Sequence, residues 1–191
     1  VGLPTLERFV EEQYLPFAKS RKKSATEEEG KLRNRILPAI GSKRIDEISP
    51  KDIDSLVRAI AAETSPSTAN RHHSLVSSVF ALAVSYGDLS ENPARKVRKH
   101  KESPARERYL SEDELQRFLA IHSVDGVSPM HIALFRFLLF TGLRKGEAVQ
   151  LTWENVHLDQ AKVYLPDTKS GSSRFVPLNK AALEVLSRVS R

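Results

Sequence analysis

Cysteine is absent from the 191 residues of this chain, which excludes disulfides, thiolate metal sites and a cysteine nucleophile. Long hydrophobic runs are absent too. The longest apolar stretch, Ile132 to Phe140, is interrupted by Arg136 and is far shorter than the roughly 20 residues that cross a bilayer. We expect that no signal peptide opens the chain and, from Val1 as its first residue, that an upstream segment was trimmed. We therefore expect a protein of the reducing cytoplasm with no membrane segment.

The composition is that of a globular protein with a packed core: 40% of the residues are hydrophobic and 28% are charged. Lys and Arg outnumber Asp and Glu by 30 to 24, and the sequence pI of about 9.6 is typical of nucleic-acid-binding proteins. Two clusters hold many of the basic residues: Arg21, Lys22 and Lys23, then Arg95, Lys96, Arg98, Lys99 and Lys101. DNA favours such clusters because each neutralised phosphate releases a counterion. On charge alone, a solvated basic loop explains them equally well.

Apolar residues at helical spacing predict four helices before residue 90. The first covers Thr5 to Lys19 with Thr5 as its N-cap, and the second runs from about Ser24 to about Pro38. The other two begin at Ser-Pro pairs, an N-cap followed by proline at the first helical position, and the last one stops at a glycine. These signals are Ser49-Pro50, Ser65-Pro66 and Gly87.

A polar, basic and proline-containing stretch follows, which indicates a linker between domains. Ser111 and Glu114 then form a capping-box pattern at the start of a second domain. Residues 129–140 are apolar nearly all round, so we expect them to form a helix buried at the centre of that domain. Residues 162–165 and 174–178 predict two strands around a hairpin loop at 167–173, and Asn179 is expected to cap a last helix.

The strongest chemical signal is Arg144 in the segment 141–147, Thr-Gly-Leu-Arg-Lys-Gly-Glu. Gly142 can end the buried helix in a left-handed turn, which leaves Arg144 at the mouth of the next element. A guanidinium there can grip a phosphate through two parallel hydrogen bonds. Glu147 lies three residues on and can hold that guanidinium in position. Taken alone, the pair is more simply explained as an ordinary surface ion pair.

The wider pattern decides between these interpretations. TGLRKGE is followed by Leu-Thr-Trp-Glu-Asn-Val at 151–156, by a strand, by Thr-Lys-Ser-Gly at 168–171 and by Arg-Phe-Val-Pro-Leu at 174–178. This order resembles the start of a tyrosine recombinase (phage integrase) catalytic domain. Upstream, Thr-Ala-Asn-Arg at 68–71 and Asn-Pro-Ala at 92–94 resemble the end of that family's helical core-binding domain. The resemblance covers nearly the whole chain.

The resemblance implies a mainly α, SAM-like core-binding domain over residues 1–93, a basic linker at 94–106, and an incomplete α+β catalytic domain with a short antiparallel hairpin over 107–191. Arg144 would be the first catalytic arginine, Glu147 its acidic companion, and Lys169 the hairpin lysine that protonates the leaving 5′-oxygen. For Lys169, a simple phosphate contact is the alternative. The predicted DNA contacts are Arg21, Lys22, Lys23, Arg71, Lys96, Arg98, Lys99 and Arg174.

The family also requires a His-x-x-Arg box and a nucleophilic tyrosine after the hairpin lysine. None of the six histidines has arginine three residues later, and all four tyrosines precede Lys169. Tyr164 is expected to pack in its strand. Adjacent His72 and His73 point about 100° apart on a helix and cannot easily share a metal ion. We therefore expect a DNA-binding fragment that is inactive alone.

The expected partner is double-stranded DNA in a bacterial or phage cell, with a homotetramer formed by the full-length protein and with no cofactor, metal or small-molecule substrate. A non-catalytic DNA-binding or regulatory module on the same scaffold is the main alternative, and a protein-interaction domain is a third. A catalytic domain cut midway is also expected to expose apolar surface from Phe137, Leu138 or Leu186.

Overall fold

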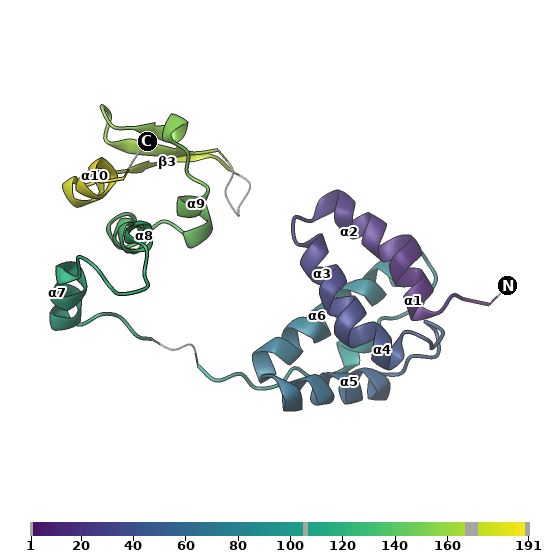
Figure 1. Cartoon of the computed structure of the whole chain (residues 1–191). Helices are drawn as coiled ribbons and strands as arrows, with labels where there is room; N and C mark the ends of the chain where they lie inside the picture. Colours follow the sequence, from purple (N-terminus) through teal and green to yellow (C-terminus); the bar gives the residue numbers. More distant parts are fainter. Residues whose placement is uncertain (1, 105–106, 167–171, 190–191) are drawn as a thin grey trace. The chain divides into compact units, whose positions relative to one another are not determined.

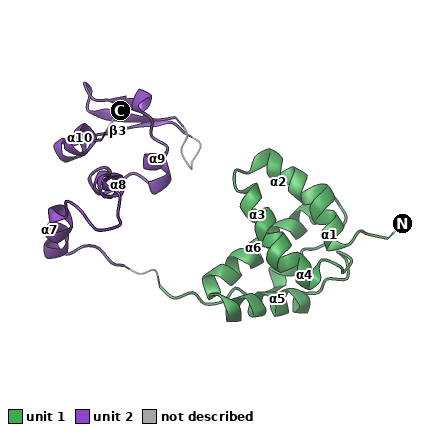
Figure 2. Cartoon of the chain, in the orientation of Figure 1, with its two compact units in different colours: residues 1–105 green, residues 106–191 purple. Residues whose placement is uncertain are grey.

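The computed structural model describes residues 2–104, 107–166 and 172–189. The chain divides into two compact units, residues 1–105 and residues 106–191, which Figure 2 shows in separate colours. The first unit is helical, and the second combines helices with a small sheet (Figure 1). Among the described residues, no helix has the length and apolar character needed to cross a membrane.

Two helical rods open the first unit, and each contains a π-helical turn directly before a proline-bearing α-helical segment. The first rod consists of α1 (Leu6–Phe9), a π turn (Val10–Tyr14) and α2 (Leu15–Arg21); the second consists of α3 (Ala25–Lys31), a π turn (Leu32–Ile36) and α4 (Leu37–Ile40). The prolines are Pro16 and Pro38. A proline ring clashes with the carbonyl four residues earlier, and the wider π turn relieves that clash. The apolar spacing alone had predicted uninterrupted helices.

The other two helices of the first unit begin where their Ser-Pro pairs predicted. In α5 (Pro50–Glu63), the Ser49 hydroxyl accepts from the Asp52 N–H, and the Asp52 carboxylate accepts from the Ser49 N–H in return. Ser65 caps α6 (Pro66–Ser85) through the Thr68 N–H. Gly87 follows α6 with φ of +82°, a conformation that glycine adopts without strain.

The stretch expected to be a linker belongs in part to the first unit. A short 3-10 helix (Pro93–Lys96) packs on the core, where Ala94 and Val97 are buried. Further along, the Asn70 side chain accepts a hydrogen bond from the His100 N–H and donates one to the His100 carbonyl. The absence of apolar periodicity had hidden this docking, because two apolar side chains and one amide suffice to hold an extended segment. The packed part of the first unit therefore extends beyond residue 93.

In the second unit, helices α7 (Glu112–Ala120), α8 (Pro129–Thr141), α9 (Lys145–Val149) and α10 (Lys180–Ser187) accompany a three-stranded antiparallel sheet. Ser111 and Asn179 cap α7 and α10 as predicted. Strands β2 (Lys162–Leu165) and β3 (Arg174–Pro177) are the predicted pair, joined by a connection that lies mostly outside the described residues. The sequence missed β1 (Val156–His157) on the other edge of β2, because two residues carry no periodic signal.

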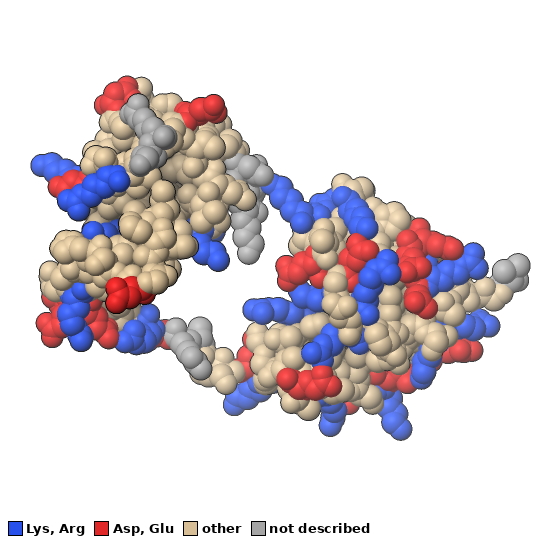
Figure 3. All heavy atoms as spheres, in the orientation of Figure 1, with Lys and Arg blue, Asp and Glu red and all other residues tan. Residues whose placement is uncertain are grey.

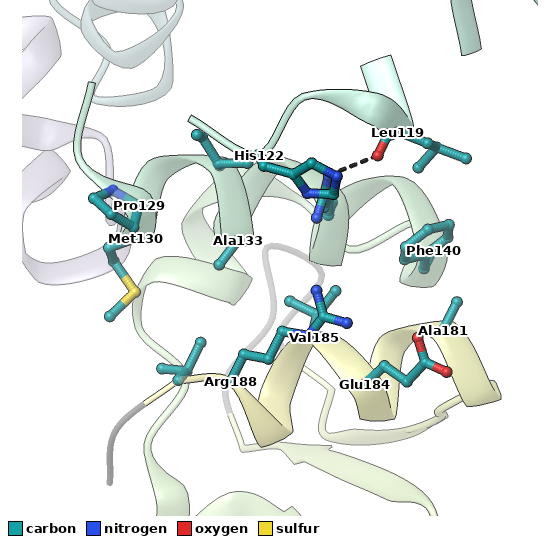
Figure 4. A pocket seen from close by; sticks show the side chains of 13 residues that line it. Leu119, His122, Pro129, Met130, Ala133, Phe140, Ala181, Glu184, Val185 and Arg188 are labelled. Atoms are coloured by element: carbon teal, nitrogen blue, oxygen red, sulfur yellow. Dashed lines mark hydrogen bonds between the residues drawn. The ribbon is translucent and has the colours of Figure 1, made fainter. Parts of the chain in front are cut away.

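The expectation that α8 is buried on all sides is wrong. It packs on α9 and α10, and Phe137 is its only buried side chain among the described residues, whereas Phe135 is 55% exposed. A hollow of about 710 Å³ lies between α8 and α10 (Figure 4). Arg136 also lines it and donates to the Leu119 carbonyl. Another hollow, of about 430 Å³, adjoins α8. The apolar composition of α8 thus exceeds the surface that neighbouring elements cover.

Candidate phosphate-binding site

Arg144 occupies the position that the sequence predicted for it, between α8 and α9. Gly142 ends α8 in the left-handed conformation, with φ of +66°, and its N–H donates to the Leu138 carbonyl. Leu143 then turns inward and is buried, so the next side chain points outward. The Arg144 side chain is 58% exposed and is accessible to a ligand.

Glu147 holds two arginines side by side. Its carboxylate accepts from Arg144 Nη1 at 3.0 Å and from Arg174 Nη2 at 2.9 Å, and it also accepts from the Arg144 backbone N–H at 3.0 Å. Only 8% of the Glu147 side chain is exposed, against 58% for Arg144 and 38% for Arg174. The carboxylate therefore holds the two guanidinium groups in position, and their outer sides remain exposed to solvent. We call these three residues the arginine clamp.

The electrostatics of the arginine clamp favour an anion. The backbone hydrogen bond from Arg144, together with the two guanidinium groups, lowers the pKa of Glu147, which keeps it ionised. Two cations and one anion leave a net charge of +1 on a fixed surface. A phosphodiester carries one negative charge, and guanidinium groups match its oxygens in geometry. The clamp is thus suited to bind one backbone phosphate.

The sequence had singled out all three members of this clamp but had missed that Arg174 shares Glu147. Arg174 was expected only as a DNA contact. It comes from β3, where it pairs with Leu165 of β2, so the fold of the sheet brings it to α9 across 27 residues of chain. No local spacing rule could have revealed that contact. Lys169, the expected general acid, lies outside the described residues.

The predicted DNA-contacting residues of the first unit lie in different surroundings. Lys22 binds the Tyr14 hydroxyl and the Glu28 carboxylate, and Lys96 forms an ion pair with Glu91. Arg21 lies over the Phe17 ring, and the other predicted contacts are exposed residues of this unit: Lys23, Arg71, Arg98 and Lys99. On the face drawn in Figure 3, the first unit shows Lys and Arg interspersed with Asp and Glu.

The four tyrosines occupy different environments. Tyr14 is 1% exposed, and burial raises the pKa of its hydroxyl, which donates to Glu28. Tyr164 packs on Phe175 in the sheet, with ring centroids 5.0 Å apart, as expected for a packing residue. Tyr86 and Tyr109 are exposed, Tyr86 next to the glycine that follows α6 and Tyr109 shortly before α7. Within the described part of the chain, no hydrogen bond joins any of the four hydroxyls to the arginine clamp.

His72 and His73, the adjacent histidines, bind separate backbone carbonyls. His72 Nδ1 lies 2.9 Å from the Thr68 oxygen, and His73 Nε2 lies 2.9 Å from the Ala94 oxygen. Both side chains are buried. They therefore serve the packing of α6 and of the segment after it.

Comparison with known proteins places both units in one family. Residues 8–100 match the phage integrase central domain, and residues 108–191 match the phage integrase family. The shufflon-specific DNA recombinase of Escherichia coli is 33% identical over 77% of this chain and 40% of its own length. Tyrosine recombinase XerD of Ralstonia nicotianae is 28% identical over 78% of this chain and 49% of its own length. The chain thus spans less than half of either relative.

Solved structures share the fold. The structure of a lambda integrase tetramer bound to a Holliday junction aligns with 97% of this chain and with 56% of the lambda integrase chain, with a TM-score of 0.78 and 20% identity. The structure of the Tn1549 transposon integrase in complex with a circular intermediate DNA aligns with 96% of this chain and with 64% of the Tn1549 integrase chain, with a TM-score of 0.77 and 18% identity. The order of motifs, the fold and both family matches agree: the chain belongs to the phage integrase, or tyrosine recombinase, family, and comprises its central core-binding domain and part of its catalytic domain.

Proposed function

We propose that this chain binds duplex DNA for site-specific recombination, with the arginine clamp gripping the backbone phosphate at which strands are exchanged. The observation that carries the proposal is the carboxylate of Glu147, 8% exposed and shared by Arg144 and Arg174. An ion pair of ordinary surface type would not need two guanidinium groups and a backbone N–H on one enclosed carboxylate. Prepositioned guanidinium groups lose little freedom when they bind a phosphate, and they can hold the charge that develops there during bond exchange.

In the proposed reaction a tyrosine attacks the gripped phosphate and displaces the 5′-oxygen of the adjoining nucleotide, which takes up a proton from Lys169. The sequence contains neither a His-x-x-Arg box nor a tyrosine after Lys169. We therefore propose that the 191 residues bind DNA without forming a covalent adduct, and that recombination requires a protein with those groups. A homotetramer on DNA, in the cytoplasm of a bacterial cell, is the proposed form of the complete recombinase.

Binding assays with matched arginine variants test the phosphate contact. Replacing Arg144 or Arg174 by Ala should weaken duplex binding and reduce the slope of log affinity against log salt by about 0.9 for each phosphate that the variant no longer neutralises. Arg117→Ala removes the same charge from an exposed position on α7 and serves as the control. Fluorescence anisotropy over a salt series provides the measurement. Equal slopes for the Arg144, Arg174 and Arg117 variants would refute the clamp as a phosphate site.

Suicide substrates, duplexes nicked beside the point of exchange, separate the recombinase from the non-catalytic module. The 191-residue chain should yield no protein-DNA adduct on a denaturing gel. A longer natural form that supplies the missing groups should yield an adduct that Arg144→Ala abolishes. No adduct from such a form would favour the non-catalytic alternative, and an adduct from the 191 residues would place the nucleophile among Tyr14, Tyr86, Tyr109 and Tyr164.

A further inference from the structure

A polar groove of about 440 Å³ lies in the first unit, along α3, α6 and the segment that follows the 3-10 helix. Its lining includes the cations Lys31, Arg71 and Lys99, the hydroxyls of Ser67, Ser74 and Ser78, and the carboxylates of Glu28 and Glu102. We call it the α6 groove. Lys31 is paired with Glu27. Within the described part of the chain, neither Arg71 nor Lys99 forms an ion pair within 4.0 Å. Arg71 and Lys99 can therefore supply charge to an anion, and the Ser67 hydroxyl can donate to it, whereas the hydroxyls of Ser74 and Ser78 already donate to backbone carbonyls.

An anion of the chain itself already lies there. The carboxylate of Glu102 accepts a hydrogen bond from Asn70 Nδ2 at 2.6 Å and another from the Ser67 side chain. These two bonds, and the nearby charges of Arg71 and Lys99, lower the pKa of Glu102 and keep it ionised. Glu102 nevertheless lies in a segment, 101–104, whose residues are all exposed. Its carboxylate can therefore leave the groove without uncovering a core.

Asn70 binds both Glu102 and the backbone of His100, in the segment that leads to the second unit. It is 5% exposed, so its amide is fixed inside the first unit. Besides binding Glu102, it accepts from the His100 N–H at 2.9 Å and donates to the His100 carbonyl at 2.9 Å. The residues at 100–102 are therefore docked on α6 through one amide and one carboxylate.

We propose that the α6 groove binds a backbone phosphate of duplex DNA, and that Glu102 occupies this site in the free protein and must leave it when DNA binds. The proposal rests on the DNA binding proposed above and adds its regulation. A carboxylate and a phosphodiester each carry one negative charge and accept hydrogen bonds from the same donors, so they cannot share one small group of cations without repulsion. DNA binding would thus remove the Asn70–Glu102 hydrogen bond and weaken the docking of residues 100–102 on α6.

Charge-matched variants test the competition. Glu102→Gln keeps the size and shape of the side chain but removes the charge that competes with phosphate. We expect it to tighten duplex binding by about two- to fivefold, the range that one ion pair near a surface supplies. Glu7→Gln changes the net charge equally, from an exposed position on α1 outside the groove, and should tighten binding less. Lys99→Ala should cancel most of the gain when it is combined with Glu102→Gln.

Hydrogen exchange at the His100 amide tests the weakened docking directly, because that N–H donates to Asn70 in the docked segment. Saturating duplex DNA should speed the exchange of the His100 amide, measured on the 191-residue chain. Unchanged or slower exchange, or equal tightening by Glu102→Gln and Glu7→Gln, would overturn the displacement of Glu102 while leaving DNA binding intact. Failure of the unaltered chain to bind duplex DNA at any salt concentration would instead overturn both proposals.

Discussion

The two units differ in how much apolar surface they bury. Among the described residues, 25 buried apolar side chains form the core of the first unit and 8 form that of the second. Exposed large hydrophobic residues show the reverse: Tyr86 is the one described in the first unit, and ten belong to the second, among them Met130, Phe135, Leu139 and Val149. Burial of apolar surface is the main favourable term in folding. The first unit therefore has the larger core, and the second leaves one side of α8 exposed.

The exposed apolar surface of the second unit lies at other residues than those predicted. Phe137 and Leu186, which were expected to expose apolar surface, belong to the second core, and Leu138 packs against it. Phe135 and Leu139 are the exposed residues of α8 near them, 55% and 41% exposed. Apolar residues gathered on one exposed face mark a contact surface in many soluble proteins.

The largest expected effect is on the core of the first unit. Phe80 is 0% exposed, and Phe80→Ala should lower the free energy of unfolding of that unit by about 3–5 kcal/mol. The matched change in the second unit, Phe135→Ala, should cost less than about 0.5 kcal/mol because its ring already contacts water. Urea unfolding followed by circular dichroism reports on the helices of both units, and the fluorescence of Trp153, the single tryptophan, reports on the second unit. A large cost for Phe135→Ala would show that its face is covered in solution.

The next largest effect concerns the arginine clamp. Glu147→Ala removes the carboxylate that Arg144 and Arg174 share and leaves their guanidinium groups repelling each other, so it should destabilise the second unit more than the loss of one exposed ion pair does. Glu12→Ala breaks an exposed ion pair with Arg8 in the first unit and should cost less than about 0.5 kcal/mol. Urea unfolding followed by Trp153 fluorescence for the Glu147 variant, and by circular dichroism for the Glu12 variant, should show the larger shift of midpoint for Glu147→Ala. A similar small shift for both variants would make the clamp an ordinary surface pair.

Acid should weaken the clamp through the same carboxylate. The pKa of Glu147 is lowered in the folded unit, so its stabilising contribution is fully present above the unfolded pKa, about 4.3, and is lost as pH falls through the lower folded pKa. In Glu147→Gln, this part of the pH dependence should disappear. Unfolding midpoints from Trp153 fluorescence between about pH 6 and about pH 3, a range chosen to bracket that pKa, check it. Identical slopes in the two proteins would contradict the lowered pKa.

The smallest effect tests one motif in both units. Ser49 and Ser111 form capping boxes with Asp52 and Glu114. Ser49→Ala should cost the first unit about 1 kcal/mol, since α5 contributes four buried side chains to its core. Ser111→Ala should fray α7 locally and barely change global unfolding, because α7 has no buried residue. Hydrogen exchange distinguishes local fraying from global loss. Equal global costs would show that α7 is packed more firmly than its exposure indicates.

Local signals predicted the helix starts well, since each depends on atoms within a few residues. Thr5, Ser49, Ser65, Ser111 and Asn179 all cap the helices assigned to them, and Gly142 ends α8 as expected. The π turns before the two internal prolines and the strand β1 were missed. The π turns depend on how each helical rod accommodates its proline, and β1 depends on pairing with β2.

By itself the sequence determined the family, the order of most helices and strands, and the candidacy of Arg144, Glu147 and Arg174 for binding phosphate, because motif order and capping are encoded locally. Only the tertiary structure decided that Glu147 serves both arginines, that Asn70 holds the segment at 100–102, and that α8 has an uncovered side. Each of these depends on residues that are distant in the chain and meet only after folding. A side chain's partner and its exposure are properties of the packed molecule, and no periodicity in the sequence specifies them.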